Sequence, residues 1–102
     1  MIEVNDDNFA NEISSGIVLV DVYGTTCAPC KAMGMILEKM EPEMDHVKMV
    51  KLCVDSSPIV SGKLDVQAIP AIFLYKDGKR IDHFVGLRGK SQIIEFINQD
   101  TK

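Results

Sequence analysis

Residues 17–30, IVLVDVYGTTCAPC, decide how this chain folds. Residues 17–23 form an almost continuous run of β-branched and other apolar side chains, which is typical of a central strand covered on both faces. A helix is predicted from Pro29, because a proline fits the first helical turn, where the N–H groups lack partners within the helix. The stretch therefore predicts a buried strand that leads into a helix, with two cysteines at the junction.

The flanking sequence predicts further strands and helices on both sides of this unit. A strand is expected at 2–4 and a helix at 8–14, with Asn5 or Asp6 as its cap and Gly16 at its end. Pro42 should bend or end the helix that begins at Pro29. The later expected elements are a strand at 47–54, a helix at 57–64 begun by Ser57-Pro58, strands at 71–75 and 80–85, and a final amphipathic helix around 93–97.

The order of these elements predicts the fold class. The Asp77-Gly78 pair between two apolar runs is a strong signal for a β-hairpin, so the last two strands should be antiparallel neighbours. The earlier strands alternate with helices, which favours parallel pairing. We therefore expect one α/β domain over residues 1–102, with a central mixed β-sheet flanked by helices on both faces.

Composition excludes several classes of function. The 102 residues carry a net charge of -4, which argues against nucleic-acid binding because such domains cluster Lys and Arg. No apolar run approaches the ~20 residues needed to cross a bilayer, so no membrane association is expected. Residues 1–7 are acidic and unlike a secretory signal, which makes the cytoplasm the expected compartment.

The motif Cys27-Ala28-Pro29-Cys30 carries the predicted chemistry. A cysteine at a helix N-terminus is stabilised as a thiolate by the helix dipole and the free N–H groups, and the thiolate is the reactive form. Two intervening residues let Cys30 reach back and close a disulfide. Pro29 lacks an N–H and removes one donor to the thiolate, so we expect a pair that readily gives up electrons.

A zinc site is the alternative interpretation of two cysteines at this spacing. Cys53, His46 or His83 would have to complete it. Structural zinc sites usually show a second pair at ligand spacing, whereas these three residues are scattered along the chain. Three cysteines are also too few, and odd in number, for the disulfide framework of a small secreted protein. The sequence favours a transient, catalytic disulfide and no bound metal or organic cofactor.

A set of motifs in a fixed order resembles the thioredoxin family. They are VDVY at 20–23, CAPCK at 27–31, KLCVD at 51–55, AIPA at 68–71, KDG at 76–78 and VG at 85–86. The resemblance covers nearly the whole chain. It implies the thioredoxin fold, with Cys27 as nucleophile and Cys30 as resolving thiol.

The resemblance also implies a substrate-binding surface beside the cysteines. Ile69-Pro70 should be a cis peptide bond, whereas an ordinary trans proline is the usual state of an X-Pro bond. An extended substrate segment should pair with the backbone of Ile69, while Pro70 keeps metal ions off the thiols. The residues expected to bind substrate are Thr26, Ala28, Pro29, Ile69, Pro70 and Gly86.

Asp21 interrupts the apolar run of its strand and matches the buried carboxylate of thioredoxins. Burial raises the pKa of a carboxyl group, so the resemblance implies that Asp21 takes the proton from Cys30 through water. Lys51 matches the lysine that pairs with this carboxylate. The alternatives are an aspartate at a strand end and a solvated surface lysine.

Two departures from the usual thioredoxin motif concern the surface around Cys27. Thr26 stands where a tryptophan is usual, and Ala28 replaces a glycine. The loss of a large flat contact puts docking of the common flavoprotein reductase in doubt. We therefore expect a monomer whose partners are disulfide-containing substrate proteins and a thioredoxin reductase, with a reductase dedicated to this protein as one form of that expectation.

The remaining cysteine, methionines and histidines are interpreted without a special role. Cys53 should be a small buried residue, with regulatory oxidation as the alternative. His46 and His83 are expected at the surface. The methionines expected to fill the core are Met33, Met35, Met40, Met44 and Met49.

The predicted function is reduction of protein disulfides by a dithiol that acts as a redox carrier for cytoplasmic proteins. An oxidant or isomerase on the same fold is the first alternative, and Pro29 and the absence of an export signal disfavour it. A binding module with the same fold, in which the redox centre is incidental, is the second alternative.

Overall fold

One mixed sheet organises the chain, whose structure is a computed structural model that describes residues 1–101. The single domain expected over 1–102 includes Lys102, which lies outside the described residues. Along the chain the elements are β1 (Ile2–Val4), α1 (Phe9–Glu12), β2 (Ile17–Tyr23), α2 (Ala28–Met40), the 3-10 turn η1 (Glu41–Glu43), β3 (Val47–Cys53), α3 (Pro58–Lys63), β4 (Ala71–Lys76), β5 (Lys79–Val85) and α4 (Lys90–Thr101).

The five strands lie in the order β1-β3-β2-β4-β5. β1, β3 and β2 are mutually parallel, because helical segments return the chain to the same end of the sheet between them. β4 runs antiparallel to β2, and β5 antiparallel to β4. The register places Asp21 of β2 between Lys51 of β3 and Ile72 of β4. The predicted mixed sheet with a central 17–23 strand is confirmed.

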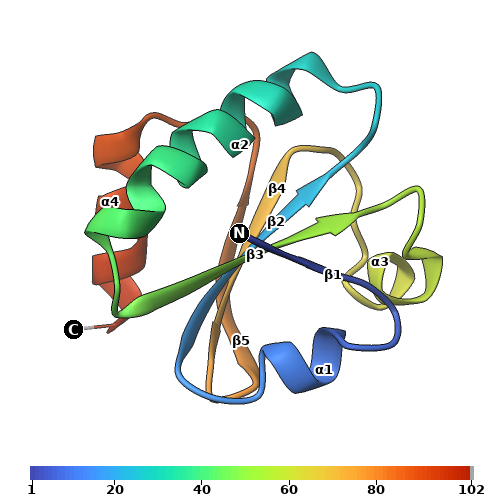
Figure 1. Ribbon diagram of the computed structural model, residues 1–102, viewed down its shortest axis with the longest axis horizontal. Helices are drawn as coiled ribbons and strands as arrows, with labels where there is room; N and C mark the ends of the chain where they lie inside the picture. Colours follow the sequence, from blue (N-terminus) through green and yellow to red (C-terminus); the bar gives the residue numbers. More distant parts are fainter. Residues whose placement is uncertain (102) are drawn as a thin grey trace.

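Helices cover both faces of the sheet, as Figure 1 shows: α1 and α3 lie on one side and α2 and α4 on the other. Alternation along β2 divides its side chains between two cores. Val18 and Val20 join the core under α1 and α3, whereas Leu19 joins the core under α2 and α4. Asp21 shares the face of Leu19, so a carboxyl group enters the apolar layer beneath α2.

The β4–β5 hairpin forms at the predicted Asp-Gly pair. Asp77 and Gly78 both have positive φ, 51° and 86°, as a tight two-residue hairpin turn requires. The Asp77 carboxylate also accepts a hydrogen bond from the N–H of Gly16, at 2.8 Å. The turn is thereby tied to the loop that begins β2.

The methionines fill the core with one exception. Met33, Met40, Met44 and Met49 are buried under α2 and α4, as predicted. Met35 is 61% exposed, so its assignment to the core was wrong. It lies on the opposite side of α2 from the stripe that faces the sheet.

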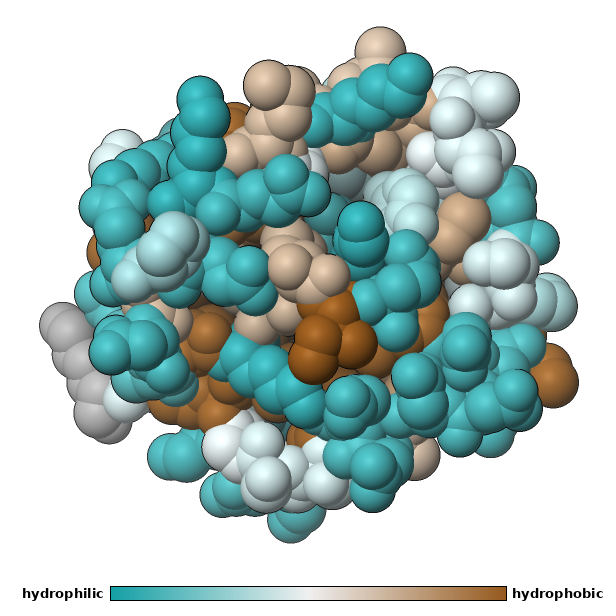
Figure 2. Space-filling model, viewed as in Figure 1, coloured by the Kyte–Doolittle hydropathy of each residue, from teal (hydrophilic) through white to brown (hydrophobic). Residues whose placement is uncertain are grey.

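One face of the molecule is mainly polar (Figure 2). Figure 2 shows a largely hydrophilic face on which the hydrophobic areas are interrupted by hydrophilic side chains. No helix in the described part of the chain combines the length and the apolarity that a membrane span requires.

Helix boundaries differ from the predictions by a few residues. α1 has only four residues, and α2 begins at Ala28 rather than Pro29 and ends at Met40, just before the turn that contains Pro42. Asn5 organises the start of α1, because its side-chain oxygen accepts hydrogen bonds from the N–H groups of Asp7 and Asn8.

Of the two residues expected as the cap of α1, Asn5 or Asp6, Asp6 does not serve that helix. Its carboxylate accepts hydrogen bonds from the N–H groups of Ile59 and Val60, at 3.3 and 2.8 Å, in the first turn of α3. The loop after β1 passes beside that turn, which lies more than fifty residues later in the chain. The Ser57 hydroxyl, next to the helix start, makes no hydrogen bond within residues 1–101.

Replacing Asp6 with alanine should therefore destabilise the fold. Two N–H groups of α3 would lose their acceptor, and loss of a helix cap costs about 1 kcal/mol of the free energy of unfolding. Urea unfolding measures the difference. Asp7→Ala is the matched control, because Asp7 is exposed one residue away. Equal losses in the two variants would contradict the cap.

Candidate active site

The two cysteines of the motif form a disulfide where β2 gives way to α2. Cys27 is the N-cap of α2, and its Sγ accepts a hydrogen bond from the N–H of Cys30 at 3.2 Å. Cys27 is half-buried, whereas Cys30 is 3% exposed. A reactant from solvent can therefore approach Cys27, and Cys30 lies behind it.

The loop that carries Cys27 is fastened to the end of β3. The Asp55 carboxylate accepts hydrogen bonds from the backbone N–H and the hydroxyl of Thr25, at 3.0 and 2.9 Å. The backbone hydrogen bond of Thr25, followed by that of its side chain, holds the pKa of Asp55 below its usual value. No local pattern in the sequence indicates this contact, because the pairing of residues 25 and 55 follows from the register of β2 and β3.

The loop that contains Pro70 packs against the same segment. The Ile69–Pro70 peptide bond is cis, as predicted. A Cβ on Gly24 would approach Ile69 Cδ1 to 2.7 Å, so the end of the Ile69 side chain would have to shift to admit one. Gly86, with a φ of 99°, donates its N–H to the carbonyl oxygen of Pro70 at 2.8 Å. Contacts thus connect three loops beside the disulfide.

The residues expected to bind substrate differ in their exposure. Thr26, Ala28 and Pro29 are exposed around the disulfide, Ile69 and Gly86 are half-buried, and Pro70 is buried. Their role in binding stays a prediction.

Asp21 lies beneath α2 and is 2% exposed. Its Oδ1 atom has no hydrogen-bond partner within residues 1–101. Burial raises the pKa of Asp21 from 3.8 to about 7, against the opposing effect of the positive charge of Lys51. Negative charge on Glu3 and Glu38 raises the pKa further. The carboxyl group can therefore exchange a proton near neutral pH.

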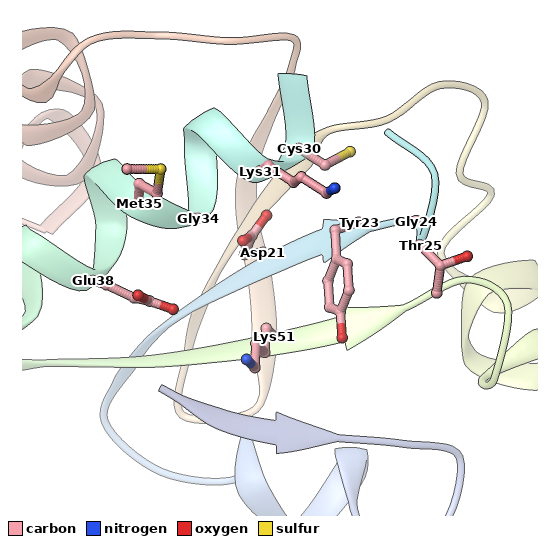
Figure 3. Close-up of a pocket in the computed structure, with 10 residues that line it drawn as sticks. All are labelled: Asp21, Tyr23, Gly24, Thr25, Cys30, Lys31, Gly34, Met35, Glu38 and Lys51. Atoms are coloured by element: carbon pink, nitrogen blue, oxygen red, sulfur yellow. The ribbon is translucent and has the colours of Figure 1, made fainter. Parts of the chain in front are cut away.

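A crevice of about 460 Å³ gives Asp21 a connection to solvent, and we call it the Asp21 crevice. Figure 3 shows the Asp21 carboxyl group directed from β2 toward α2, with Lys51 on the neighbouring strand β3. The titratable residues that line it are Asp21, Tyr23, Cys30, Lys31, Glu38 and Lys51. The crevice thus brings the resolving cysteine and the raised-pKa carboxyl group to one space.

Lys51 lies beside Asp21 but forms no ion pair with it. The two residues lie opposite each other in the β2–β3 register. No ion pair within 4.0 Å joins them in the part of the chain that the structure describes. The half-buried position of Lys51 also differs from that of a fully solvated surface lysine.

Among the described residues, the remaining cysteine and the two histidines do not come together as metal ligands. Cys53 is buried as predicted, and its thiol lies 3.8 Å from Asp55 Oδ2. His46 and His83 are exposed as predicted, and the His83 ring stacks on Phe73. Residues 1–101 contain no group of three His, Cys, Asp or Glu side chains that could hold a metal ion.

A disulfide between two cysteines three positions apart, with the accessible sulfur at a helix N-terminus beside a cis-proline loop, defines a thiol-disulfide oxidoreductase. The family model for thioredoxin matches residues 1–99. A thioredoxin from Chlamydia trachomatis is 40% identical over 96 residues, which are 94% of each chain. A thioredoxin from Bacillus subtilis is 35% identical over 100 residues, 97% of this chain and 96% of that one.

The solved structure of a thioredoxin from Malassezia sympodialis, Mala s 13, has the same fold. Its TM-score is 0.87 at 28% identity, with 98% of this chain and 92% of that chain covered. The chain belongs to the thioredoxin family. It is a thiol-disulfide reductase whose redox group is the Cys27–Cys30 pair, and the family implies disulfide substrates and a thioredoxin reductase as partners.

Proposed function

We propose that this protein is a single-domain dithiol electron donor to cytoplasmic proteins, with Cys27 as nucleophile and Cys30 as resolving thiol. The observation that carries the proposal is the unequal exposure of the two sulfurs at the N-terminus of α2. The half-buried Cys27 can meet a substrate disulfide, and the buried Cys30 can meet only Cys27. The N–H of Cys30 and the dipole of α2 stabilise the Cys27 thiolate in the reduced protein.

The reaction transfers two electrons to the substrate in two exchanges. The Cys27 thiolate attacks one sulfur of the substrate disulfide, so a mixed disulfide forms and the second substrate sulfur leaves as a thiolate that takes up a proton. Cys30 then loses its proton and attacks Cys27 Sγ. The first substrate sulfur leaves, and the protein is left with the Cys27–Cys30 disulfide.

Asp21 is the proposed acceptor of the Cys30 proton. Its pKa of about 7 lets it take a proton from the attacking thiol at neutral pH and release it afterwards. The Asp21 crevice contains both groups and supports transfer through water. Lys51 faces Asp21 from β3 without forming an ion pair with it, and its positive charge limits the rise in the pKa of Asp21.

Substrate proteins should dock along the edge formed by the three connected loops. An extended segment would pair with the backbone of Ile69 beside Pro70, and would pass Gly86 on its way to Cys27. Thr26, Ala28 and Pro29 would border it on the other side, and their exposure supports this assignment.

The electron source is proposed to be a thioredoxin reductase adapted to this surface. Thr26 presents a small polar side chain before Cys27, so a reductase that relies on a large aromatic contact at this position would bind weakly. We propose a monomer, in keeping with the largely hydrophilic face in Figure 2.

The reduction potential of the Cys27–Cys30 pair tests the direction of electron flow. Equilibration in thiol–disulfide buffers, followed by thiol alkylation and a gel shift, measures it. A value near about -270 mV or lower is expected for an electron donor, whereas a value above about -200 mV would indicate an oxidant or isomerase. Cys53→Ser is the control, because it leaves the two active-site cysteines as the only thiols.

A further inference from the structure

A row of charged side chains crosses the sheet beneath α2. In the parallel register of β1, β3 and β2, Glu3 lies opposite Lys51, and Lys51 lies opposite Asp21. One lysine therefore stands between two carboxyl groups on neighbouring strands. On the far side of Asp21 the neighbour is Ile72, so no charge of β4 faces Asp21 in this row.

Tyr23 holds the outer carboxylate in place. Its hydroxyl donates a hydrogen bond to Glu3 Oε1 at 2.7 Å, which is a short, charge-assisted bond. Figure 3 shows the ring extending from β2 across β3, toward the strand that carries Glu3. Burial and this hydrogen bond raise the pKa of Tyr23 above its usual value, so the hydroxyl remains a donor at every physiological pH. Glu3 is thus fixed although it lies on an exposed edge strand.

Lys51 is not paired with any of the carboxyl groups around it. Within residues 1–101 it makes no hydrogen bond and no ion pair within 4.0 Å, and Asp21 Oδ1 is likewise without a partner. An ammonium group that closed onto Asp21 would stabilise the ionised carboxylate and make it a poorer proton acceptor. The titratable groups that face Asp21 or border its crevice are Cys30, Lys31 and Glu38 on α2, Lys51 on β3, Glu3 on β1 and Tyr23 on β2.

We propose that Glu3 is a positioning residue for the redox reaction: held by Tyr23, it attracts the ammonium group of Lys51 away from Asp21 and so keeps Asp21 able to accept a proton at neutral pH. The inference rests on the proposed role of Asp21 as proton acceptor. It adds a role for a strand that lies two strands away from Asp21 in the sheet.

Glu3→Gln tests the proposal. The amide oxygen of glutamine can still accept the hydrogen bond from Tyr23, so the ring stays in place while the negative charge is removed. Titration of the ¹³C carboxyl signals of the oxidised protein, with the Asp21 signal identified by its absence in Asp21→Asn, measures the midpoint. We expect the midpoint to fall by about half a pH unit, because Lys51 is released toward Asp21.

Glu12→Gln is the matched control. Glu12 also lies beside a lysine of β3, Lys48, at 3.3 Å, but on the other face of the sheet. It removes the same charge and should leave the Asp21 midpoint unchanged. A Glu3→Gln midpoint that moves no more than that of the control would overturn the proposal.

A second background tests whether Glu3 acts through the lysine. Lys51→Gln should raise the Asp21 midpoint, and in that background Glu3→Gln should lower it by less than half as much as in the wild type. Equal shifts in both backgrounds would show a direct effect of the Glu3 charge on Asp21 and would overturn the positioning role. The titration needs no turnover, so its outcome is independent of whether Asp21 accepts the Cys30 proton.

Discussion

Asp21→Asn is expected to remove a pH-dependent instability of up to roughly 4 kcal/mol from the oxidised protein. The folded protein holds the Asp21 proton with a pKa of about 7, against 3.8 in the unfolded chain. Between these values the folded state binds more protons, so the stability contributed by the neutral carboxyl group is complete below pH 3.8 and is lost as the pH rises through about 7. Asparagine does not titrate, so the variant does not lose stability in this way as the pH rises.

Urea unfolding at several pH values from 4 to 8 measures this difference. The stability of the variant relative to the wild type should increase with pH over this range, on top of a constant offset for the buried amide. Asp7→Asn, at an exposed position, is the control and should give a flat difference. A flat difference for Asp21→Asn as well would mean that Asp21 ionises in the folded protein as it does in the unfolded one.

The same variant should slow the resolution of the mixed disulfide by about 10²-fold at neutral pH, the lower end of what general base catalysis contributes. Single-turnover decay of a mixed disulfide on Cys27 reports this step separately from its formation. If the variant gains stability with pH but resolves the mixed disulfide at the wild-type rate, Asp21 is buried with a raised pKa but takes no part in resolution.

Cys30→Ser is expected to trap substrate proteins on Cys27 and to lower disulfide reduction by roughly 10³-fold or more. The half-buried Cys27 sulfur still attacks, but the buried Cys30 thiol that would release the substrate is gone, and the remaining thiol, Cys53, is buried elsewhere in the core. Non-reducing electrophoresis detects the covalent complex, and a reductant should dissolve it.

Cys27→Ser should show the same loss of activity without any covalent complex, because Cys30 is 3% exposed. Cys53→Ser should keep both activity and turnover. If Cys27→Ser kept the cellular partners and role of the wild type, the protein would be a binding module with an incidental redox pair.

Local sequence patterns predicted the central strand, the helix that follows it and the two cysteines at their junction. The apolar run of 17–23 indicated a buried strand, and the single carboxyl group within it identified Asp21 as unusual before its surroundings were known. Its proton-accepting potential follows from burial, which the apolar residues on both sides of Asp21 indicate in the sequence. The family resemblance supplied the cis bond before Pro70, which no local pattern indicates.

Contacts between remote segments could not be predicted in this way. The hydrogen bonds from Thr25 to Asp55 and from Tyr23 to Glu3 depend on which strands become neighbours and in what register. Asp6 accepts a hydrogen bond from the first turn of a helix that begins over fifty positions later. Its place in the sequence had instead favoured a role as the cap of α1. Such residues are polar and unremarkable in sequence, and only the tertiary pairing gives them a role.

The close packing of Gly24 against Ile69, together with the hydrogen bond from Gly86 to Pro70, has a consequence for attempts to redesign this protein. Three segments that are distant in sequence share one border around the disulfide, and each contacts the next. A loop grafted from a relative at one of these places would inherit the wrong neighbours. Changing the preference for substrates therefore requires that the three segments be exchanged as a set.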